Sequence, residues 1–153
     1  TRKERLHRMS EKQPTCKERW AHEKNERIRD LRRLLKAAHA GEDSALYKRT
    51  AEDIGTIYEY GLVFDYVAPG TFEKQLEGYW RYQLSWGGPS DEFRFYSSDP
   101  HSDPYRITYV FLDWFDGYER KLTGKDEALL LEYWQDFEDM GVTQGEYERA
   151  MED

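Results

Sequence analysis

Cysteine is nearly absent from this sequence, and its scarcity excludes two kinds of cross-link. Cys16 is the only cysteine among 153 residues, so the chain forms no internal disulfide and no four-thiolate metal site. Histidine is also scarce, and the one histidine outside the basic first third, His101, lies in the polar stretch SDPHSDP. Ligands on one short loop without regular spacing are weak support for metal binding. We therefore expect neither a metal nor another cofactor.

Long hydrophobic runs are missing as well. The sequence has no run of about 18 apolar residues, and no apolar segment follows the basic residues at its beginning. Membrane-spanning helices and secretory signals both need such segments. These absences predict a cytoplasmic protein without a membrane partner.

The common motifs of catalysis are absent too, including HExxH, GxSxG and a glycine-rich phosphate loop. The remaining candidates are Asp113 and Asp116 in LDWFDG, which together with Arg81 could serve a small enzyme. A structural interpretation competes with this one. Asp116-Gly117 favours a turn, and Asp113 can pair with Arg81 or Arg94 on a neighbouring strand.

Charge is abundant but unevenly distributed. Residues 1–50 hold fifteen Lys and Arg against eight Asp and Glu, whereas residues 51–153 hold eight against twenty-three. Such a division indicates which partners each part of the chain can approach. The basic part suits nucleic acid, and the acidic part suits a positively charged protein surface. We divide the chain accordingly into a basic helical arm, 1–41, and an α+β domain with acidic C-terminal helices, 42–153.

Two helices are predicted in the first part of the chain. Thr15 opens a capping-box pattern, and apolar residues then recur at helical spacing up to a C-cap at Gly41. The second helix begins at Asp43 or Ser44 and ends at Gly61. One side of the first helix carries the basic residues that we consider for nucleic-acid contact, namely Arg27, Arg29, Arg32, Arg33 and Lys36.

Apolar alternation then replaces helical spacing and predicts a four-stranded antiparallel meander, with strands at 62–67, 79–86, 92–96 and 105–115. The last strand is apolar on both faces and is expected to be central or covered by helices. One face of the sheet is expected to form the core, through Trp80, Tyr82, Leu84, Trp86, Phe93 and Phe95. The other face has the composition of a platform for stacking single-stranded nucleic acid, with Tyr79, Arg81, Gln83, Ser85, Arg94 and Tyr96.

Helical spacing returns after Gly124, and Thr143 is expected to cap a last short helix. The fold class is therefore α+β, with two N-terminal helices, the meander sheet and C-terminal helices packed on one face. Rows of carboxylates on the long helix can imitate nucleic-acid phosphates toward a basic groove, although an ordinary solvated helix face has the same pattern. The candidate partner-binding residues are Glu132, Asp136, Glu138 and Asp139, with Asp91 and Glu92 as secondary candidates.

Three stretches carry a family resemblance: EYGLVFDYVAPGTF, EGYWRYQLSWGGPSDEFRFY and ITYVFLDWFDG. Over residues 59–117 the chain resembles a group of small acidic proteins from bacterial plasmids, integrative elements and phages, marked by LSWGGPSDEFRF and LDWFDG. The resemblance implies a setting and no catalytic residues. Small acidic proteins of mobile elements often inhibit host defence, as anti-CRISPR and antirestriction proteins do.

The sequence thus supports three hypotheses. The leading one is a non-enzymatic interaction protein of a mobile genetic element. It would inhibit a host nucleic-acid-handling defence complex, a protein or ribonucleoprotein with a basic groove, through its acidic surface. The second is a nucleic-acid-binding regulator that uses the basic N-terminal helix. The third is a small enzyme with a site around Asp113 and Asp116.

Overall fold

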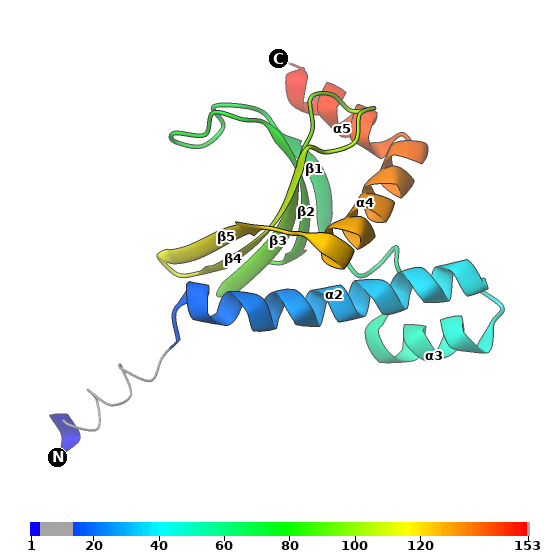
Figure 1. The fold of residues 1–153 in the computed structure, drawn as a ribbon, viewed down its shortest axis with the longest axis horizontal. Helices are drawn as coiled ribbons and strands as arrows, with labels where there is room; N and C mark the ends of the chain where they lie inside the picture. Colours follow the sequence, from blue (N-terminus) through cyan, green and yellow to red (C-terminus); the bar gives the residue numbers. More distant parts are fainter. Residues whose placement is uncertain (4–13, 153) are drawn as a thin grey trace.

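The computed structural model describes residues 1–3 and 14–152, so residues 4–13 of the expected basic arm lie outside the description. Two helices open the described fold, α2 (Cys16–Ala40) and α3 (Ala45–Ile54), as Figure 1 shows. Thr15 caps α2 as predicted, because its Oγ1 accepts the Glu18 N–H at 3.2 Å. The Glu18 carboxylate accepts the Thr15 hydroxyl at 3.1 Å, where a full capping box would use the Thr15 backbone N–H. α3 ends earlier than the expected Gly61. Gly55 leaves the helix with a φ of 94°, a left-handed conformation that glycine adopts without strain.

Five antiparallel strands form one sheet in the order β1-β2-β3-β4-β5. They are β1 (Val63–Val67), β2 (Tyr79–Ser85), β3 (Pro89–Tyr96), β4 (Arg106–Asp113) and β5 (Asp116–Lys121). The prediction of four strands was wrong by one edge strand. β5 reads DGYERK and is largely exposed, so it lacks the apolar alternation by which a strand is recognised. β4 lies between β3 and β5, inside the sheet, as expected.

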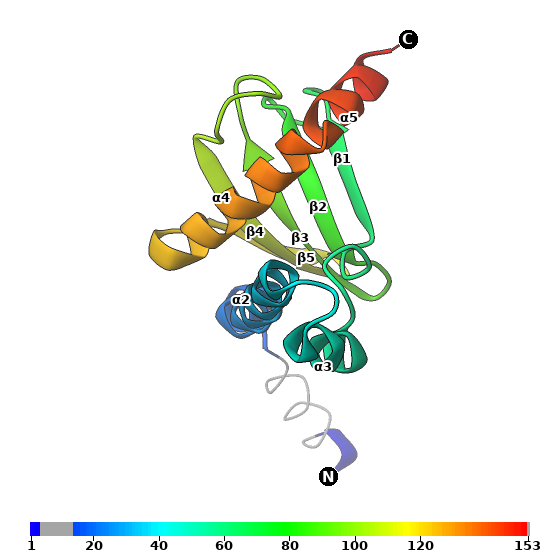
Figure 2. The same cartoon turned by 90° about the vertical axis from the view of Figure 1, so that its right-hand side faces the viewer.

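Two helices complete the fold, α4 (Gly124–Asp139) and α5 (Val142–Met151). Figure 2 shows α4 and α5 crossing one face of the sheet, with α2 running beneath them on the same side. Thr143 does not cap α5, which begins after Gly141 with a left-handed φ of 77°. The Thr143 hydroxyl is buried instead and donates to the Pro100 carbonyl at 2.8 Å. Its own carbonyl accepts the indole N–H of Trp80 at 2.9 Å.

The core lies between the helices and the aromatic face of the sheet. Trp80, Phe93 and Phe95 are buried there together with Trp134 of α4. α2 contributes its apolar stripe to the same cluster, so the expected boundary at residue 41 does not separate two cores.

One expected core residue lies outside this cluster. Trp86 is 77% exposed, because the pairing register shifts between Gln83 and Ser85. Such a bulge turns the residues beyond it to the opposite side. Ser85 therefore faces the helices and donates to Asp91, while Trp86 lies in the turn.

A buried ion pair ties α2 to the sheet. Arg27 donates through Nε and Nη2 to the two carboxylate oxygens of Asp91 at 2.7 and 3.0 Å, and Asp91 is only 3% exposed. The same carboxylate accepts the Tyr109 hydroxyl at 2.6 Å. Burial opposes the guanidinium charge, but the hydrogen bonds and charge of Asp91 outweigh it and raise the pKa of Arg27 above its ordinary value.

We expect Arg27→Met to lower the free energy of unfolding by about 3–5 kcal/mol, because it leaves the Asp91 carboxylate buried without its cation. Chemical denaturation followed by circular dichroism measures the change. Arg29→Met is the matched control, since Arg29 is exposed and pairs with Glu26 within the helix. Its loss should change stability by no more than about 0.5 kcal/mol. Equally small effects of both substitutions would contradict the anchoring role of Arg27.

Candidate functional site

An apolar groove of about 510 Å³ lies where the C-terminal turns of α2 and α4 meet β1. We call it the α2–α4 groove. The linker between α3 and β1 closes one side of it. Its lining residues are mostly apolar or aromatic: Leu35, Ala38, His39, Ile57, Tyr58, Gly61, Leu62, Val63, Phe64, Tyr82, Tyr133, Asp136, Phe137, Asp139 and Met140.

The floor of the groove is built from packed aromatic rings. Phe64 of β1 and Phe137 of α4 stack with their centroids 4.1 Å apart, and Tyr82 meets Phe137 edge to face at 5.4 Å. The Tyr133 hydroxyl donates to the Leu31 carbonyl at 2.6 Å, which ties the floor to α2. Burial raises the pKa of Tyr82 to about 12, so its ring stays neutral. These contacts hold the rings of the floor against one another and against α2.

Glycine is required where the linker crosses this floor. A Cβ on Gly61 would lie 2.1 Å from Cε1 of Tyr82, so a side chain here would push the linker off the ring. The neighbouring linker residues turn outward instead. Tyr58 is 74% exposed and Leu62 is 57% exposed. With the exposed Met140 at the end of α4, they leave the upper edge of the groove apolar and open to solvent.

Two of the candidate acidic residues, Asp136 and Asp139, border the groove, and His39 faces them from α2. Desolvation raises the pKa of Asp136 above its ordinary value, and the nearby charges of Asp139 and Glu132 raise it further, while His39 acts in the opposite direction. Asp136 is exposed, and its ionised form is less favoured in the folded protein than in an isolated carboxyl group. A cation placed beside it would relieve this cost.

The other acidic candidates are placed differently. Glu132 is exposed but borders a second depression, which earlier residues of α2 and α4 line. Glu138 is half-buried on the same helix and does not line the α2–α4 groove. Asp91 and Glu92 are buried and paired with Arg27 and Arg94. These last two do not belong to any accessible acidic surface, because internal arginines neutralise them.

The basic candidates on α2 fall into two groups, those paired with acids of the protein and those open to solvent. Arg27 is the internal partner of Asp91, so it does not present its charge to a ligand. Arg33 pairs with Asp53 of α3 at 2.8 Å. Arg32 and Lys36 are exposed and line the second depression together with Lys125 of α4. Only part of the expected basic stripe is therefore open to an anionic partner.

The acids proposed for catalysis are used to hold the start of α2. Asp116 Oδ2 accepts the Cys16 N–H at 2.8 Å, and this hydrogen bond lowers the pKa of Asp116. Asp113 pairs with Arg19 at 2.8 Å. An arginine was expected beside Asp113, but the expected partners were wrong. Arg81 pairs with Asp65 on β1 instead, so the structure does not bring it together with Asp113 and Asp116.

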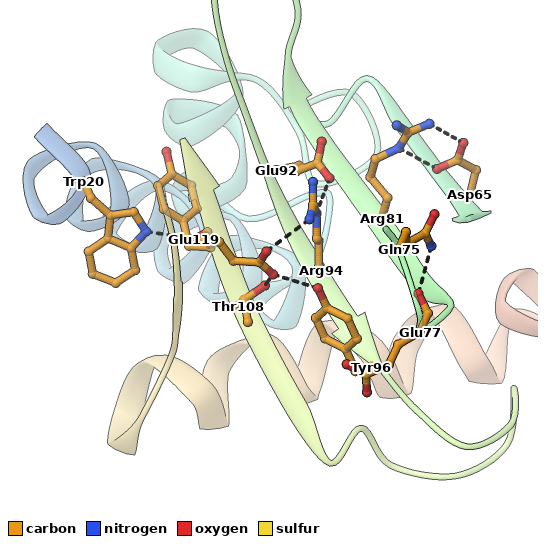
Figure 3. A network of polar contacts seen from close by, with 11 residues as sticks. Trp20, Asp65, Gln75, Glu77, Arg81, Glu92, Arg94, Tyr96, Thr108 and Glu119 are labelled. Atoms are coloured by element: carbon orange, nitrogen blue, oxygen red, sulfur yellow. Dashed lines mark hydrogen bonds and ion pairs between the residues drawn. The ribbon is translucent and has the colours of Figure 1, made fainter. Parts of the chain in front are cut away.

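The uncovered face of the sheet carries a connected set of ion pairs, shown in Figure 3. Glu119 of β5 accepts from Arg94 at 3.1 Å, from Tyr96 at 2.7 Å and from Thr108 at 2.7 Å. Arg94 also donates to Glu92 at 2.8 Å. These charges are satisfied within the sheet. The ring faces expected to stack nucleic acid are covered, because the Arg94 guanidinium lies 4.5 Å from the Tyr79 ring and that of Arg106 lies 3.9 Å from the Tyr96 ring.

Residues 1–3 and 14–152 contain no group of three or more His, Cys, Asp and Glu side chains placed to hold a metal ion. His101 and Asp99 belong to a local turn, in which the Asp99 carboxylate accepts the His101 N–H at 2.8 Å. Within the described part of the chain, no helix is both long and apolar enough to span a bilayer.

Comparison with known proteins adds no family assignment: no protein-family model matches the chain, and neither curated proteins nor solved structures give a significant match. The family resemblance of residues 59–117 and the setting that it implies therefore stay predictions.

Sequence reasoning pointed to Asp136 and Asp139 but missed the apolar wall beside them. Ile57 and Tyr58 continue the apolar spacing of α3, so the pattern predicts a longer helix that ends at Gly61. Leu62 is predicted as the first residue of the strand at 62–67, but it lies in the linker before β1. The signal that could have separated Ile57 and Tyr58 from α3 is Gly55, a helix-terminating residue close to the actual end of α3.

We expect Asp136→Asn to stabilise the free protein at neutral pH by no more than about 0.5 kcal/mol. The folded-state pKa of Asp136 is raised, so the folded protein loses stability as the pH rises through that pKa. The variant lacks this loss. Thermal unfolding of both proteins from pH 3 to pH 7 should show the same midpoint at low pH and a higher midpoint for the variant at neutral pH. A variant less stable than the wild type at pH 7 would contradict this description of the groove.

Proposed function

We propose that this protein is a non-enzymatic interaction protein, and that it holds a partner protein in the α2–α4 groove. The observation that carries the proposal is the combination at one place of an open apolar groove and two carboxylates at its border. The partner that fits is a protein segment with an apolar side chain for the groove and a Lys or Arg beside it for Asp136 and Asp139.

The exposed side chains of the groove would gain more free energy from a bound partner than they contribute to folding. Exposed apolar side chains such as Tyr58 and Leu62 gain about 25 cal/mol for each Å² removed from water when a partner covers them. A rigid aromatic floor limits the entropy lost on binding. Asp136, which is exposed but has a raised pKa, gains a counter-ion. The surplus acidic charge of residues 51–153 attracts a basic partner from a distance.

The family resemblance suggests the class of partner. Proteins of mobile elements that act without catalysis commonly block a host defence complex, and such complexes present basic grooves where they hold nucleic acid. We propose that the partner is a component of a host nucleic-acid-handling complex, of the kind inhibited by anti-CRISPR or antirestriction proteins. We infer the class of partner from the resemblance carried by LSWGGPSDEFRF and LDWFDG, and we infer the mode of contact from the groove.

The first experiment is an affinity pull-down from bacterial lysate, with and without nuclease. We expect a protein that is retained after nuclease treatment and released by salt. The partner is then purified, and its affinity for the protein is measured by titration calorimetry. Loss of all capture after nuclease would show that nucleic acid, and not the groove, holds the complex together.

We expect the double substitution Asp136→Lys and Asp139→Lys to weaken binding of the purified partner by at least tenfold, about 1.4 kcal/mol. The matched control is Glu132→Lys with Glu138→Lys. It makes the same change in net charge on the same helix but alters no residue that lines the groove. The control should reduce affinity by less than about threefold, through long-range attraction alone. Equal losses in both variants would contradict a specific groove and favour a diffuse acidic surface.

A further inference from the structure

The second depression, between α2 and α4, has a volume of about 490 Å³ and carries more positive than negative charge. Arg32 and Lys36 line it from α2, and Lys125 lines it from α4, against the single carboxylate of Glu132. All four side chains are exposed. Within residues 1–3 and 14–152, none of the three cations forms an ion pair. We call this hollow the basic depression.

The neighbouring acids do not cancel this charge. Asp126, the residue after Lys125, is already paired with Lys24 at 2.6 Å. Asp136 lies one turn beyond Glu132 and borders the α2–α4 groove. Even when Asp136 is counted, three cations without a carboxylate partner face two carboxylates. The described charges at the basic depression are therefore net positive, in a protein whose net charge is −8.

The last turn of α5 presents the complementary arrangement. Glu148, Met151 and Glu152 follow one another at i, i+3 and i+4, so they share one face of the helix. All three are exposed, and Met151 keeps 53% of its surface in solvent. Arg149 lies off this face and pairs with Glu146 at 3.4 Å. In the described part of the chain, no cation pairs with Glu148 or Glu152, so the face holds an apolar side chain between two carboxylates.

The two surfaces cannot meet within one molecule, because Figure 1 shows α2 and the end of α5 at opposite ends of it. Two copies can bring them together. Each copy offers a cationic hollow at one end and an anionic helix face at the other. Surfaces of opposite charge steer association and fix how two partners are oriented.

We infer that the basic depression binds the last turn of α5 from a second copy of this chain. Met151 of one copy covers the buried apolar residues Leu35 and Leu129, which line the depression of the next copy. Glu148 and Glu152 meet its three cations. The apolar lining favours this occupant over nucleic acid, because a phosphate backbone offers no apolar group to cover it.

The contact is head to tail, so each pair of copies keeps one free depression and one free α5 end. Further copies can then add, or a small ring can close. An interface built on one helix end is smaller than the interfaces of stable complexes. We therefore expect weak self-association that depends on protein concentration.

Sedimentation velocity of the pure protein, over a roughly hundredfold range of concentration, tests the inference first. The weight-average sedimentation coefficient should rise with concentration. Two double variants then test the two surfaces, Arg32→Glu with Lys36→Glu and, separately, Glu148→Lys with Glu152→Lys. Each should weaken self-association by at least about tenfold, since each places like charges on both sides of the contact. All four residues are exposed, so circular dichroism should show an unchanged fold.

The decisive measurement mixes the two double variants in equal amounts. The intact basic depression of one variant should bind the intact α5 end of the other, and heterodimers should form where each variant alone stays monomeric. A merely structural effect of the substitutions would not be reversed by mixing. Lys48→Glu with Arg49→Glu is the matched control. It makes the same change in net charge as the α2 variant, on exposed residues of α3, and should alter self-association by less than about threefold.

Three results would overturn the inference: a sedimentation coefficient that does not rise with concentration, unchanged association in either double variant, or no recovery in the mixture. A monomeric protein that binds duplex DNA, and loses that binding with Arg32→Glu and Lys36→Glu, would assign the basic depression to nucleic acid instead. The experiments use this protein alone. Their failure therefore leaves the proposed partner of the α2–α4 groove unaffected, and a failure to find that partner leaves self-association unaffected.

Discussion

The buried ion pair between Arg27 and Asp91 is the contact on which the rest of the arrangement depends. It joins the middle of a long helix to a strand inside the sheet, and the Tyr109 hydroxyl completes its hydrogen bonding. Fixing the middle of α2 also fixes its two ends. One end lies against the β4–β5 turn through Arg19 and Cys16, and the other end meets α4 to form one side of the α2–α4 groove.

The two faces of the sheet serve different purposes. The helix-covered face is filled with aromatic rings and supplies the core. The uncovered face is polar, yet it has little charge to offer a ligand, because Arg81, Arg94 and Arg106 each pair with a carboxylate. Charge that could attract a partner lies elsewhere, on the exposed sides of the helices. For this reason we propose that a partner binds at the α2–α4 groove and not on the open sheet.

The sequence was sufficient for the class of fold and for most of the core. Helical spacing located α2 and α4 because each buries a regular apolar stripe, and period-two alternation located β2 and β3 because one face of each is covered. Prediction from the sequence failed where the local pattern is weak or misleading. β5 has no buried side, the bulge before Trp86 is invisible in a pattern of alternation, and the apolar residues after Gly55 imitate a longer helix.

At the candidate site, the local sequence pattern identified the acidic and basic residues but not which of them are accessible to a partner. Asp91 and Asp136 look equivalent in the sequence, and only tertiary packing separates a buried acid with its own arginine from an acid at the border of a groove. The same holds for Arg27 and Arg32. Whether a charge is available depends on its partner, and partners more than sixty residues apart, as in the pair Arg27 and Asp91, cannot be assigned from composition or spacing.

Amide hydrogen exchange, followed with and without the recovered partner protein, tests the central claim most directly. If the groove holds the partner, exchange should slow in the linker residues 57–62, at the start of β1 and in the last turn of α4, and should be unchanged in β5. Protection confined to the open face of the sheet, or absent from the linker, would contradict the account.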